Sequence, residues 1–509
     1  MSSPIDILIV GFGAVGTVYG WILSQHSNVQ VTAIARSSYD AMKDGITIES
    51  EKYGLIRDWK PYRLVRTADE ANDRPYKFII CATKCLPDLM PTASVLAPFL
   101  ESQHALAKSV DLEDGPTVVL IQNGIGIEHP LATAYPSVPI ISVVAWIGAN
   151  LKEGGRVTHG LLEQLIMGLY TGEGGQTPVD PEFVEDAFAD PHGYRQQTDG
   201  PARLEEGKRR LQAFADLLNG GGGTATVVSD IQAERYSKNL WNAAWSSLCT
   251  MSRCTVSQAV APSVLPYTLP VIRRTMLEVI YVARAWGYSE QVLPVSRIDD
   301  AIKLTIKNYQ RRMPRAPPSG PGAVPETPAE TPWTSPVDNK GAGYGFPTPG
   351  ELAEESQESS YNFKPSMLLD IEAGRPCELE PIIGSVLDRA RARGVPTPRL
   401  DMAYATLKIH QDSAVRDHAS SSTYQAHINS WLSRPPAVAG LGAAGRAAWE
   451  KERSRRERMP EFEKGSVAIA GGRDKIPGKP IRTEETSDII DEEDESGPGN
   501  PSSLTQSVL

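Results

Sequence analysis

Over the first part of the chain, short apolar runs are separated by segments with helical periodicity or turn residues. The runs cover residues 5–10, 29–35, 76–83, 117–122, 139–144, 164–170 and 224–228. Runs of this length and composition predict strands. Apolar strands separated by helical segments are typical of a mostly parallel sheet with helices on both faces. We therefore predict an α/β domain over residues 1–228.

From residue 229 the pattern changes to long helical periods. Helices are predicted at 230–251, 270–286, 296–312, 380–393 and 399–410. Residues 313–360 are rich in Pro, Gly, Ser, Thr and Glu, and they carry too little apolar surface to offset the entropy of ordering. We predict an all-α domain over 229–434 with a flexible, disordered insertion at 313–360. Residues 435–509 are predicted to form a low-complexity, largely disordered acidic tail.

Charge adds little to this picture, because much of the net charge of −11 comes from the tail. Eight acidic residues lie within residues 484–495, and such runs normally stay solvated. The rest of the 509-residue chain is close to neutral. We therefore expect no nucleic-acid partner and no membrane partner.

The chain also lacks the patterns of membrane, secreted and zinc proteins. No apolar run reaches the ~18–20 residues of a membrane-spanning helix, and no basic flank precedes the first apolar run. Five cysteines spread over a long chain are unlike a disulfide framework. Cys81 and Cys85 have no second Cys or His pair at zinc spacing, so no metal site is expected. These features predict a cytoplasmic protein with reduced thiols.

A glycine-rich turn follows the first strand directly. It reads Gly11-Phe12-Gly13-Ala14-Val15-Gly16. The first glycine permits a sharp turn, the second lets the backbone approach a pyrophosphate, and the third lets the next helix pack closely. The helix N-terminus offers free N–H groups to the phosphates. Strand, turn and helix together predict a Rossmann-type dinucleotide-binding domain.

The end of the second strand indicates which dinucleotide is bound. An NAD site usually has an Asp or Glu there, which accepts hydrogen bonds from the ribose 2′-hydroxyl. This chain has Arg36, followed by Ser37 and Ser38. A guanidinium suits a 2′-phosphate, so Arg36 favours NADP, although a surface arginine at a strand end is the alternative.

Other polar residues lie at strand ends and on one later helix. Lys84 and Asn123 follow predicted strands, at the edge of the sheet where ligands bind in such folds. Lys238, Asn242 and Ser246 have the spacing i, i+4, i+8 and form one polar stripe of a helix. The stripe is either the solvent boundary of that helix or the wall of a cleft, and periodicity leaves both open.

In this order and spacing, the motifs resemble the ketopantoate reductase (2-dehydropantoate 2-reductase) family. The glycine turn, Lys84, the turn at 122–124 and the stripe at 238–246 are similar to the family's motifs. The resemblance covers about residues 5–411, apart from the 313–360 insertion.

Two later segments extend this resemblance. Residues 366–370 read Ser-Met-Leu-Leu-Asp, like the family's Ser-Met-Leu-x-Asp helix. Residues 377–380 read Cys-Glu-Leu-Glu, where the family has a Thr-Glu-Ile-Asp-like turn.

The resemblance implies that NADPH reduces a small 2-keto acid in a cleft between the two domains. Lys238 would donate the proton, and Glu378 would reach the nicotinamide region and the substrate hydroxyl. The implied substrate-binding residues are Asn123, Asn242, Ser246 and Ser366. The implied cofactor-binding residues are those of the glycine turn, Arg36, Lys84, Asn123 and Glu378. No metal is required.

These residue types fit the reaction. A lysine ammonium can stabilise the negative charge that develops on a carbonyl oxygen and then protonate it. Amides and a hydroxyl can bind the substrate without adding charge. A carboxylate such as Glu378 would keep Lys238 protonated and oriented.

Each assignment has a structural alternative. Ser366 could cap the helix that follows it, Glu378 could be a first-turn acid, and Asn123 could belong only to a turn. Ser246 stands where the family usually has a second asparagine, and Cys377 where it has threonine. The shorter side chain of Ser246 is the reason to consider a ketone other than 2-dehydropantoate as the substrate.

The sequence thus predicts an NADPH-dependent reductase, with conversion of 2-dehydropantoate to pantoate in pantothenate biosynthesis as the leading reaction. A related reductase for another ketone and a non-catalytic NADP-binding sensor or scaffold are alternatives. A dehydrogenase of sugar acids or glycerol phosphate would need basic residues near the lysine, and Arg235 is the obvious candidate. A homodimer is left open.

Overall fold

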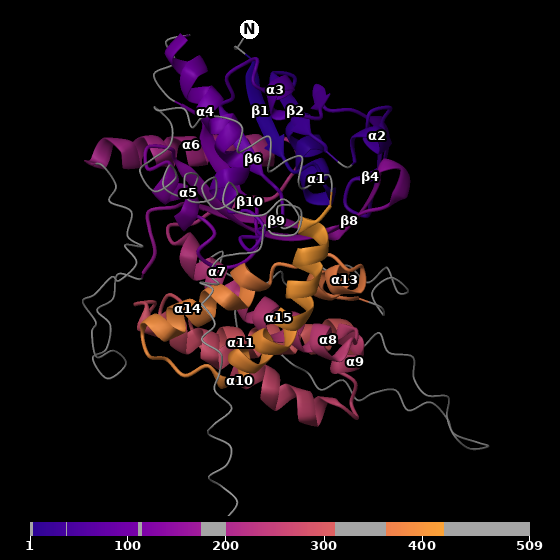
Figure 1. Cartoon of the computed structure of the whole chain (residues 1–509), viewed down its shortest axis with the longest axis vertical. Helices are drawn as coiled ribbons and strands as arrows, with labels where there is room; N and C mark the ends of the chain where they lie inside the picture. Colours follow the sequence, from indigo (N-terminus) through magenta and orange to yellow (C-terminus); the bar gives the residue numbers. More distant parts are fainter. Residues whose placement is uncertain (1–3, 37, 110–114, 175–199, 311–362, 422–509) are drawn as a thin grey trace, which may run out of the picture. The chain divides into compact units, whose positions relative to one another are not determined.

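The computed structural model describes residues 4–36, 38–109, 115–174, 200–310 and 363–421 (Figure 1). The predicted insertion at 313–360 and the predicted tail at 435–509 lie outside the described residues, as does most of the loop expected before residue 200. The predicted domain boundaries stay predictions.

The described part of the N-terminal half forms one ten-stranded sheet with the order β4-β3-β9-β8-β7-β6-β1-β2-β5, and β10 pairs with β9. The strands are β1 (Ile5–Val10), β2 (Val29–Ile34), β3 (Ile46–Ser50), β4 (Gly54–Trp59), β5 (Arg63–Val65), β6 (Phe78–Cys81), β7 (Thr117–Leu120), β8 (Ile140–Leu151), β9 (Arg156–Leu169) and β10 (Ala225–Val227).

Strands β5, β2, β1, β6, β7 and β8 pair in parallel, whereas β9 is antiparallel to β8. Because β1 lies between β2 and β6, the strand order reverses there, which is the ligand-binding position in open parallel sheets.

Strand β1 is apolar apart from Asp6 near its start, because both faces of the sheet are covered. Ile7 and Ile9 pack in a cluster with Phe214, on the side of α1 (Ala14–Leu23) and α6 (Gly200–Gly220). The alternate residues Leu8 and Val10 pack on the other side, with α4 (Thr92–Ser109) and α5 (His129–Ala134). The period of two along a strand places successive side chains in these two cores.

The predicted strands are present, and three further short strands, β3 to β5, were not predicted. Strand β4 is largely exposed, so its sequence lacks an apolar run. Strands β8 and β9 also extend well beyond their predicted apolar runs, because their outer parts pair with each other in a less buried hairpin. Small helices α2 (Tyr39–Met42) and α3 (Ala68–Ala71) complete this half.

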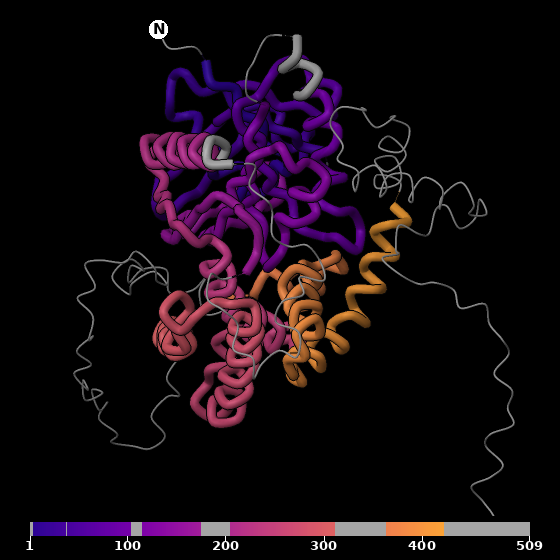
Figure 2. The backbone as a smooth tube through the Cα atoms, turned by 90° about the vertical axis from the view of Figure 1, so that its left-hand side faces the viewer, coloured from indigo at the N-terminus to yellow at the C-terminus, as the bar shows by residue number. Residues whose placement is uncertain are grey.

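The C-terminal half is helical, and Figure 2 traces the chain from the indigo and purple strands into the magenta and orange helices. Its elements are α7 (Ile231–Trp241), the π-helical segment η3 (Asn242–Ser246), α8 (Ser247–Ser252), α9 (Val256–Ala259), α10 (Leu265–Ala285), α11 (Ser296–Gln310), α13 (Ser366–Glu372), the π-helical segment η4 (Glu380–Gly384), α14 (Ser385–Ala392) and α15 (Pro398–Ala419).

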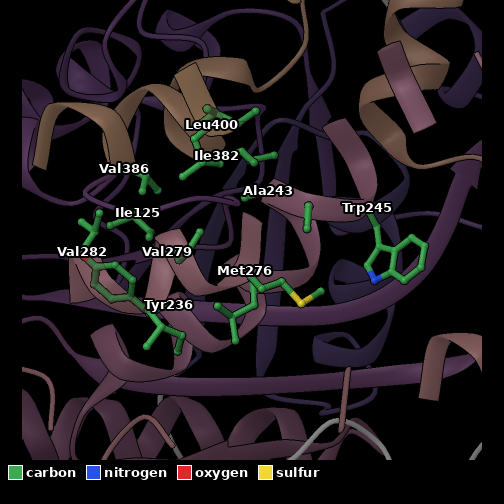
Figure 3. Packing of buried hydrophobic residues seen from close by; sticks show 14 of the residues in the cluster. Ile125, Tyr236, Ala243, Trp245, Met276, Val279, Val282, Ile382, Val386 and Leu400 are labelled. Atoms are coloured by element: carbon green, nitrogen blue, oxygen red, sulfur yellow. The ribbon is translucent and has the colours of Figure 1, made fainter. Parts of the chain in front are cut away.

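One core joins these helices. Tyr236 of α7, Ala243 of η3, Met276 of α10 and Ile382 of η4 belong to the same buried cluster (Figure 3). The helix predicted as continuous from 230 to 251 is interrupted by the π-helical turn, which apolar periodicity does not reveal.

The predicted fold class, a Rossmann-type α/β domain followed by a helical domain, is confirmed. Across the described residues, no helix has the length and apolar character needed to cross a membrane.

Candidate active site

The glycine turn has the geometry of a dinucleotide-binding loop. Gly11 has φ +97°, and a Cβ there would lie 2.5 Å from the backbone N of Thr83. A Cβ on Gly16 would lie 2.5 Å from the carbonyl oxygen of Gly11. These two positions therefore need glycine for conformation and for close packing.

The space in front of the turn is open. Gly13 is the N-cap of α1 and makes no side-chain capping hydrogen bond, and a Cβ there would meet nothing within 4 Å. Phe12 is buried against Trp59 and thus offers only its backbone, while Ala14 and Val15 begin the helix. Open space before an uncapped helix N-terminus fits a pyrophosphate.

Arg36 lies just beyond the carboxyl end of β2, and its side chain is exposed. Nearby, the Ser38 hydroxyl donates a hydrogen bond of 3.3 Å to the carbonyl oxygen of Phe12. Arg36 is therefore at the same edge of the sheet as the glycine turn.

Lys238, in the last turn of α7, faces the carboxyl ends of the strands. Its Nζ donates to Oδ1 of Asn123 at 2.8 Å and to the carbonyl oxygen of Ala145 at 2.6 Å. The Trp146 ring centroid lies 5.5 Å from the same nitrogen. Two of the three ammonium protons are thus used within the described chain, which leaves one for a ligand.

Asn123 connects Lys238 to a carboxylate of the helical half. Its Nδ2 donates to Oε2 of Glu378 at 2.8 Å, and the backbone N–H of Cys85 donates to Oε1 at 3.0 Å. Glu378 is buried, and it acts on Lys238 through Asn123 and through space rather than by a direct hydrogen bond.

The surroundings change the acidity of this lysine. Burial lowers the pKa of Lys238 to about 8, the charge of Glu378 opposes this shift, and Arg235 adds to it. Near neutral pH, a lysine with this pKa is protonated and is a stronger acid than an exposed lysine.

A small polar pocket lies beside Lys238. It is lined by Gln122, Asn123, Gly124, Val144, Arg235, Lys238, Asn239 and Asn242. Of the predicted substrate residues, Asn123 and Asn242 are brought together here. Ser246 is buried at the end of η3 and is not among the lining residues, and Ser366 is exposed in the first turn of α13.

The π-helical turn helps to explain this separation. It begins at Asn242, which still follows the periodicity of α7, and ends at Ser246. A π-helical turn has more residues per turn than an α-helix, so the stripe expected from α-helical spacing does not hold through it. Ser366 also does not cap its helix, because Pro365 is the N-cap residue.

Lys84 pairs closely with Asp370 of α13. Arg375 donates to the same carboxylate at 3.1 Å. Lys84 thus connects the end of β6 with the helical half, and its ammonium remains partly exposed at the edge of the sheet.

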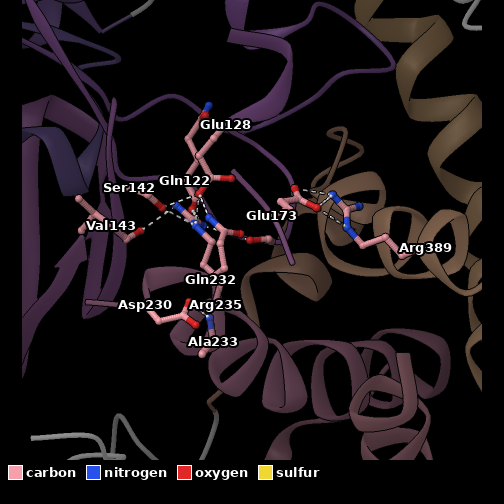
Figure 4. A network of polar contacts seen from close by, with 11 residues as sticks. Gln122, Glu128, Ser142, Val143, Glu173, Asp230, Gln232, Ala233, Arg235 and Arg389 are labelled. Carbon is pink, nitrogen blue, oxygen red and sulfur yellow. Dashed lines mark hydrogen bonds and ion pairs between the residues drawn. The ribbon is translucent and has the colours of Figure 1, made fainter. Parts of the chain in front are cut away.

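The buried network around Arg235 was not predicted from the sequence (Figure 4). Its Nη1 donates to the carbonyl oxygens of Gln122 and Gly124 at 2.9 and 3.0 Å. Its Nε lies 2.6 Å from Oε1 of Glu128, and both side chains are almost fully buried. Arg235 therefore holds the two residues that flank Asn123.

Asn239 was also missed. Its Nδ2 donates to the carbonyl oxygen of Ile382 at 2.9 Å, while its buried Oδ1 has no partner among the described residues. Since Arg235 and Asn239 neighbour Lys238 along the helix, a search for further polar residues on α7 could have found both.

Within the described chain, no group of three or more His, Cys, Asp or Glu residues could hold a metal ion. The groups near Lys238 are amides, carbonyl oxygens, a carboxylate and a guanidinium. They can bind a polar organic ligand and donate a proton to it.

The sheet is doubly wound and carries a glycine turn of the nucleotide-binding type. The helices that follow bring a lysine to the carboxyl edge of this sheet. These features together are typical of the two-domain dehydrogenases. Sequence models described as "Ketopantoate reductase PanE/ApbA" and its "C terminal" match residues 7–172, and 230–320 with 342–411, respectively. These matches span more than half of the chain, so the chain belongs to the ketopantoate reductase family, as its motifs predicted. The family comprises oxidoreductases that act on CH–OH groups and bind a nicotinamide dinucleotide.

The individual relatives have low sequence identity to this chain, but the alignments cover most of each relative's length. The Saccharomyces cerevisiae protein YDL144C is 23% identical over 80% of this chain and 93% of its own length. A 2-dehydropantoate 2-reductase from Nostoc sp. is 22% identical over 79% of this chain and 93% of its own length.

Solved structures share the fold. The 2-dehydropantoate 2-reductase of Methylococcus capsulatus has a TM-score of 0.53 at 22% identity and covers 81% of this chain and 98% of its own. A D-mandelate dehydrogenase, solved with NADH and anilino(oxo)acetate, has a TM-score of 0.52 at 16% identity, with coverage of 81% and 99%.

Proposed function

We propose that this protein is an NADPH-dependent reductase of a small 2-keto acid, with 2-dehydropantoate as the leading substrate and pantoate as the product. The observation that carries the proposal is the half-buried Lys238 ammonium, held by Asn123 beside a polar pocket. A cytoplasmic location and a role in pantothenate biosynthesis belong to the same proposal.

Lys238 is the proposed acid. When bound, the reduced nicotinamide supplies a hydride to the carbonyl carbon of the substrate. The remaining proton of Lys238 stabilises the developing charge on the carbonyl oxygen and is then transferred to it. Asn123 and Ala145 fix the direction of the ammonium, since both accept hydrogen bonds from it.

The neutral amides of Asn123 and Asn242 are proposed to hold the substrate. They add no charge beside Lys238. The pKa of Lys238 is therefore set by its burial and by the charges of Glu378 and Arg235. Glu378 is proposed to orient Asn123 and to keep the lysine cationic. Ser246 and Ser366 lack support from the pocket lining as direct substrate ligands.

Residues 11–16, Arg36 and Lys84 are proposed to hold the dinucleotide. The open space before Gly13 supports pyrophosphate binding, and the exposed guanidinium of Arg36 supports a 2′-phosphate.

We expect Arg36→Ala to weaken NADPH binding about 10- to 100-fold, because it removes charged hydrogen bonds, and to leave NADH binding nearly unchanged. Fluorescence titration of both cofactors measures this, with exposed Arg57→Ala as control. Equal weakening of both cofactors would contradict the assignment.

Catalysis is tested by Lys238→Ala. We expect kcat to fall by about 10²- to 10⁴-fold, as for loss of a general acid, with little change in the dissociation constant for NADPH. The exposed Lys307→Ala on α11 is the matched control. If Lys238→Ala kept its turnover, the protein would belong with the alternative, a non-catalytic sensor or scaffold that binds NADP.

A reductase for another ketone is the second candidate. Ser246 stands where the family usually has an asparagine and does not line the pocket, so one expected substrate contact is missing. A screen of NADPH consumption over branched, hydroxylated and aromatic 2-keto acids separates the two. Turnover of 2-dehydropantoate at least as high as that of every other ketone supports the leading proposal. Turnover only of other substrates supports the second.

A further inference from the structure

Helix α8 ends in a motif that brings two cysteines together. Arg253 has a left-handed backbone (φ 55°, ψ 33°). The N–H of Cys254 bonds to the carbonyl oxygen of Cys249 at 3.0 Å, and the N–H of Arg253 to that of Thr250 at 3.4 Å. This 6→1 and 5→2 pair of bonds is the Schellman motif, in which the side chains of the first and sixth residues commonly touch. Here those side chains are the two thiols.

The two thiols have different surroundings. Cys249 is fully buried in the helical core, whereas Cys254 is half-buried at its edge. Oγ of Ser252 lies 3.0 Å from Sγ of Cys254. A hydrogen bond from the Cys249 thiol lowers the pKa of Cys254 to about 6, and the same bond raises the pKa of Cys249. Cys254 is therefore the accessible and more nucleophilic partner.

The other cysteines do not share this environment. Cys81, Cys85 and Cys377 are buried, and burial raises the pKa of each thiol. Among the cysteines that the structure describes, only the pair at the end of α8 combines a partly exposed thiol with a second cysteine at the other position of the same helix-ending motif.

We propose that Cys249 and Cys254 form a thiol–disulfide site that is oxidised by hydroperoxides, a chemistry separate from the proposed keto-acid reduction. The Cys254 thiolate attacks the terminal peroxide oxygen, so that an S–O bond forms, the O–O bond breaks and an alkoxide or hydroxide leaves. The Cys249 sulfur then displaces water from the sulfenic acid and closes the disulfide. In total, two thiols are oxidised to one disulfide. One hydroperoxide is reduced to an alcohol, or hydrogen peroxide to water, and the second step releases one further molecule of water.

The position of the pair in the chain makes it convenient to test. Trypsin cleaves after Lys238, Arg253 and Arg273, so Cys249 and Cys254 fall on separate peptides, 239–253 and 254–273. The full-length protein is treated with hydrogen peroxide, alkylated under denaturing conditions and digested. We expect a disulfide-linked pair of these two peptides, removed by dithiothreitol, while the other three cysteines stay alkylated.

Two variants separate the steps. Cys254→Ser should abolish the linked peptides, and Cys249→Ala should leave a sulfenic acid on peptide 254–273 that dimedone traps. On the wild-type protein, the rate of alkylation of Cys254 should rise with a midpoint near pH 6, the pKa of its thiol. Peroxide treatment that leaves all five cysteines alkylated, or that oxidises Cys254 to a sulfinic acid without linked peptides, would overturn the proposal.

Discussion

At the scale of single residues, opposing effects of the surroundings set the pKa of Lys238, and the site depends on the result. Burial and Arg235 favour its neutral form, and Glu378 favours its charged form. The resulting pKa of about 8 keeps the proton available near neutral pH. Lys238 and Glu378 were predicted from the family's motifs, whereas the position of Asn123 between them was not.

The pH profile should report this balance. In the proposed mechanism the acid form of Lys238 is the active one, so kcat/KM for ketone reduction should be constant at lower pH and fall as pH rises through about 8. Glu378→Gln removes a negative charge that raises the pKa of Lys238, so it should move this fall to lower pH. The matched control is Glu372→Gln on the exposed side of α13. An unchanged profile in Glu378→Gln would contradict the electrostatic role.

At the scale of elements, the β1–turn–α1 unit was predictable because its function depends on local backbone geometry. The glycines are adjacent in sequence, and their roles follow from turn and helix sterics. The π-helical turn after α7 was not predictable in this way, because its residues have ordinary helix-forming patterns. Strands β3 to β5 were missed because they are short and largely lack apolar runs.

Two glycine substitutions should separate stability from cofactor binding. Gly16→Ala places a Cβ 2.5 Å from the backbone oxygen of Gly11, so we expect a loss of about 1–3 kcal/mol in unfolding free energy. Gly13→Ala meets nothing within 4 Å in the protein, so stability should hardly change while the dissociation constant for the dinucleotide rises. Thermal denaturation and cofactor titration measure the two effects. Tight cofactor binding by Gly13→Ala would show that no phosphate approaches this residue.

At the scale of the whole described molecule, buried ion pairs join the sheet to the helices. Glu128 follows β7 and pairs with Arg235 of α7, while Glu173 follows β9 and pairs with Arg389 of α14 at 2.6 Å (Figure 4). A buried ion pair of this kind adds little net stability, because the cost of desolvating both charges offsets their attraction, but each charge then depends on its partner. These ion pairs were not predicted from the sequence, because the two residues of each pair lie far apart along the chain.

Breaking one pair should therefore be costly. Glu173→Gln leaves the Arg389 guanidinium buried without its counter-charge, and we expect a loss of about 3–5 kcal/mol in unfolding free energy. The double variant Glu173→Met/Arg389→Met should lose less, because no charge remains buried. Glu205→Gln breaks an exposed pair with Lys208 and should lose at most about 1 kcal/mol. Urea unfolding compares the three, and equal losses would contradict the argument.

The sequence by itself determined the α/β-then-helical fold class, the glycine turn after β1 and the family, because each is expressed in local periodicity or in motifs of fixed spacing. It also supplied Lys238, Asn123 and Asn242 as candidates. Only the tertiary structure decided that Asn123 holds Lys238, that Glu378 acts through Asn123, and that Ser246 and Ser366 lie away from the pocket lining. These contacts join residues as many as 255 positions apart, and their geometry depends on how the helices pack against the sheet. A local pattern carries no information about that packing.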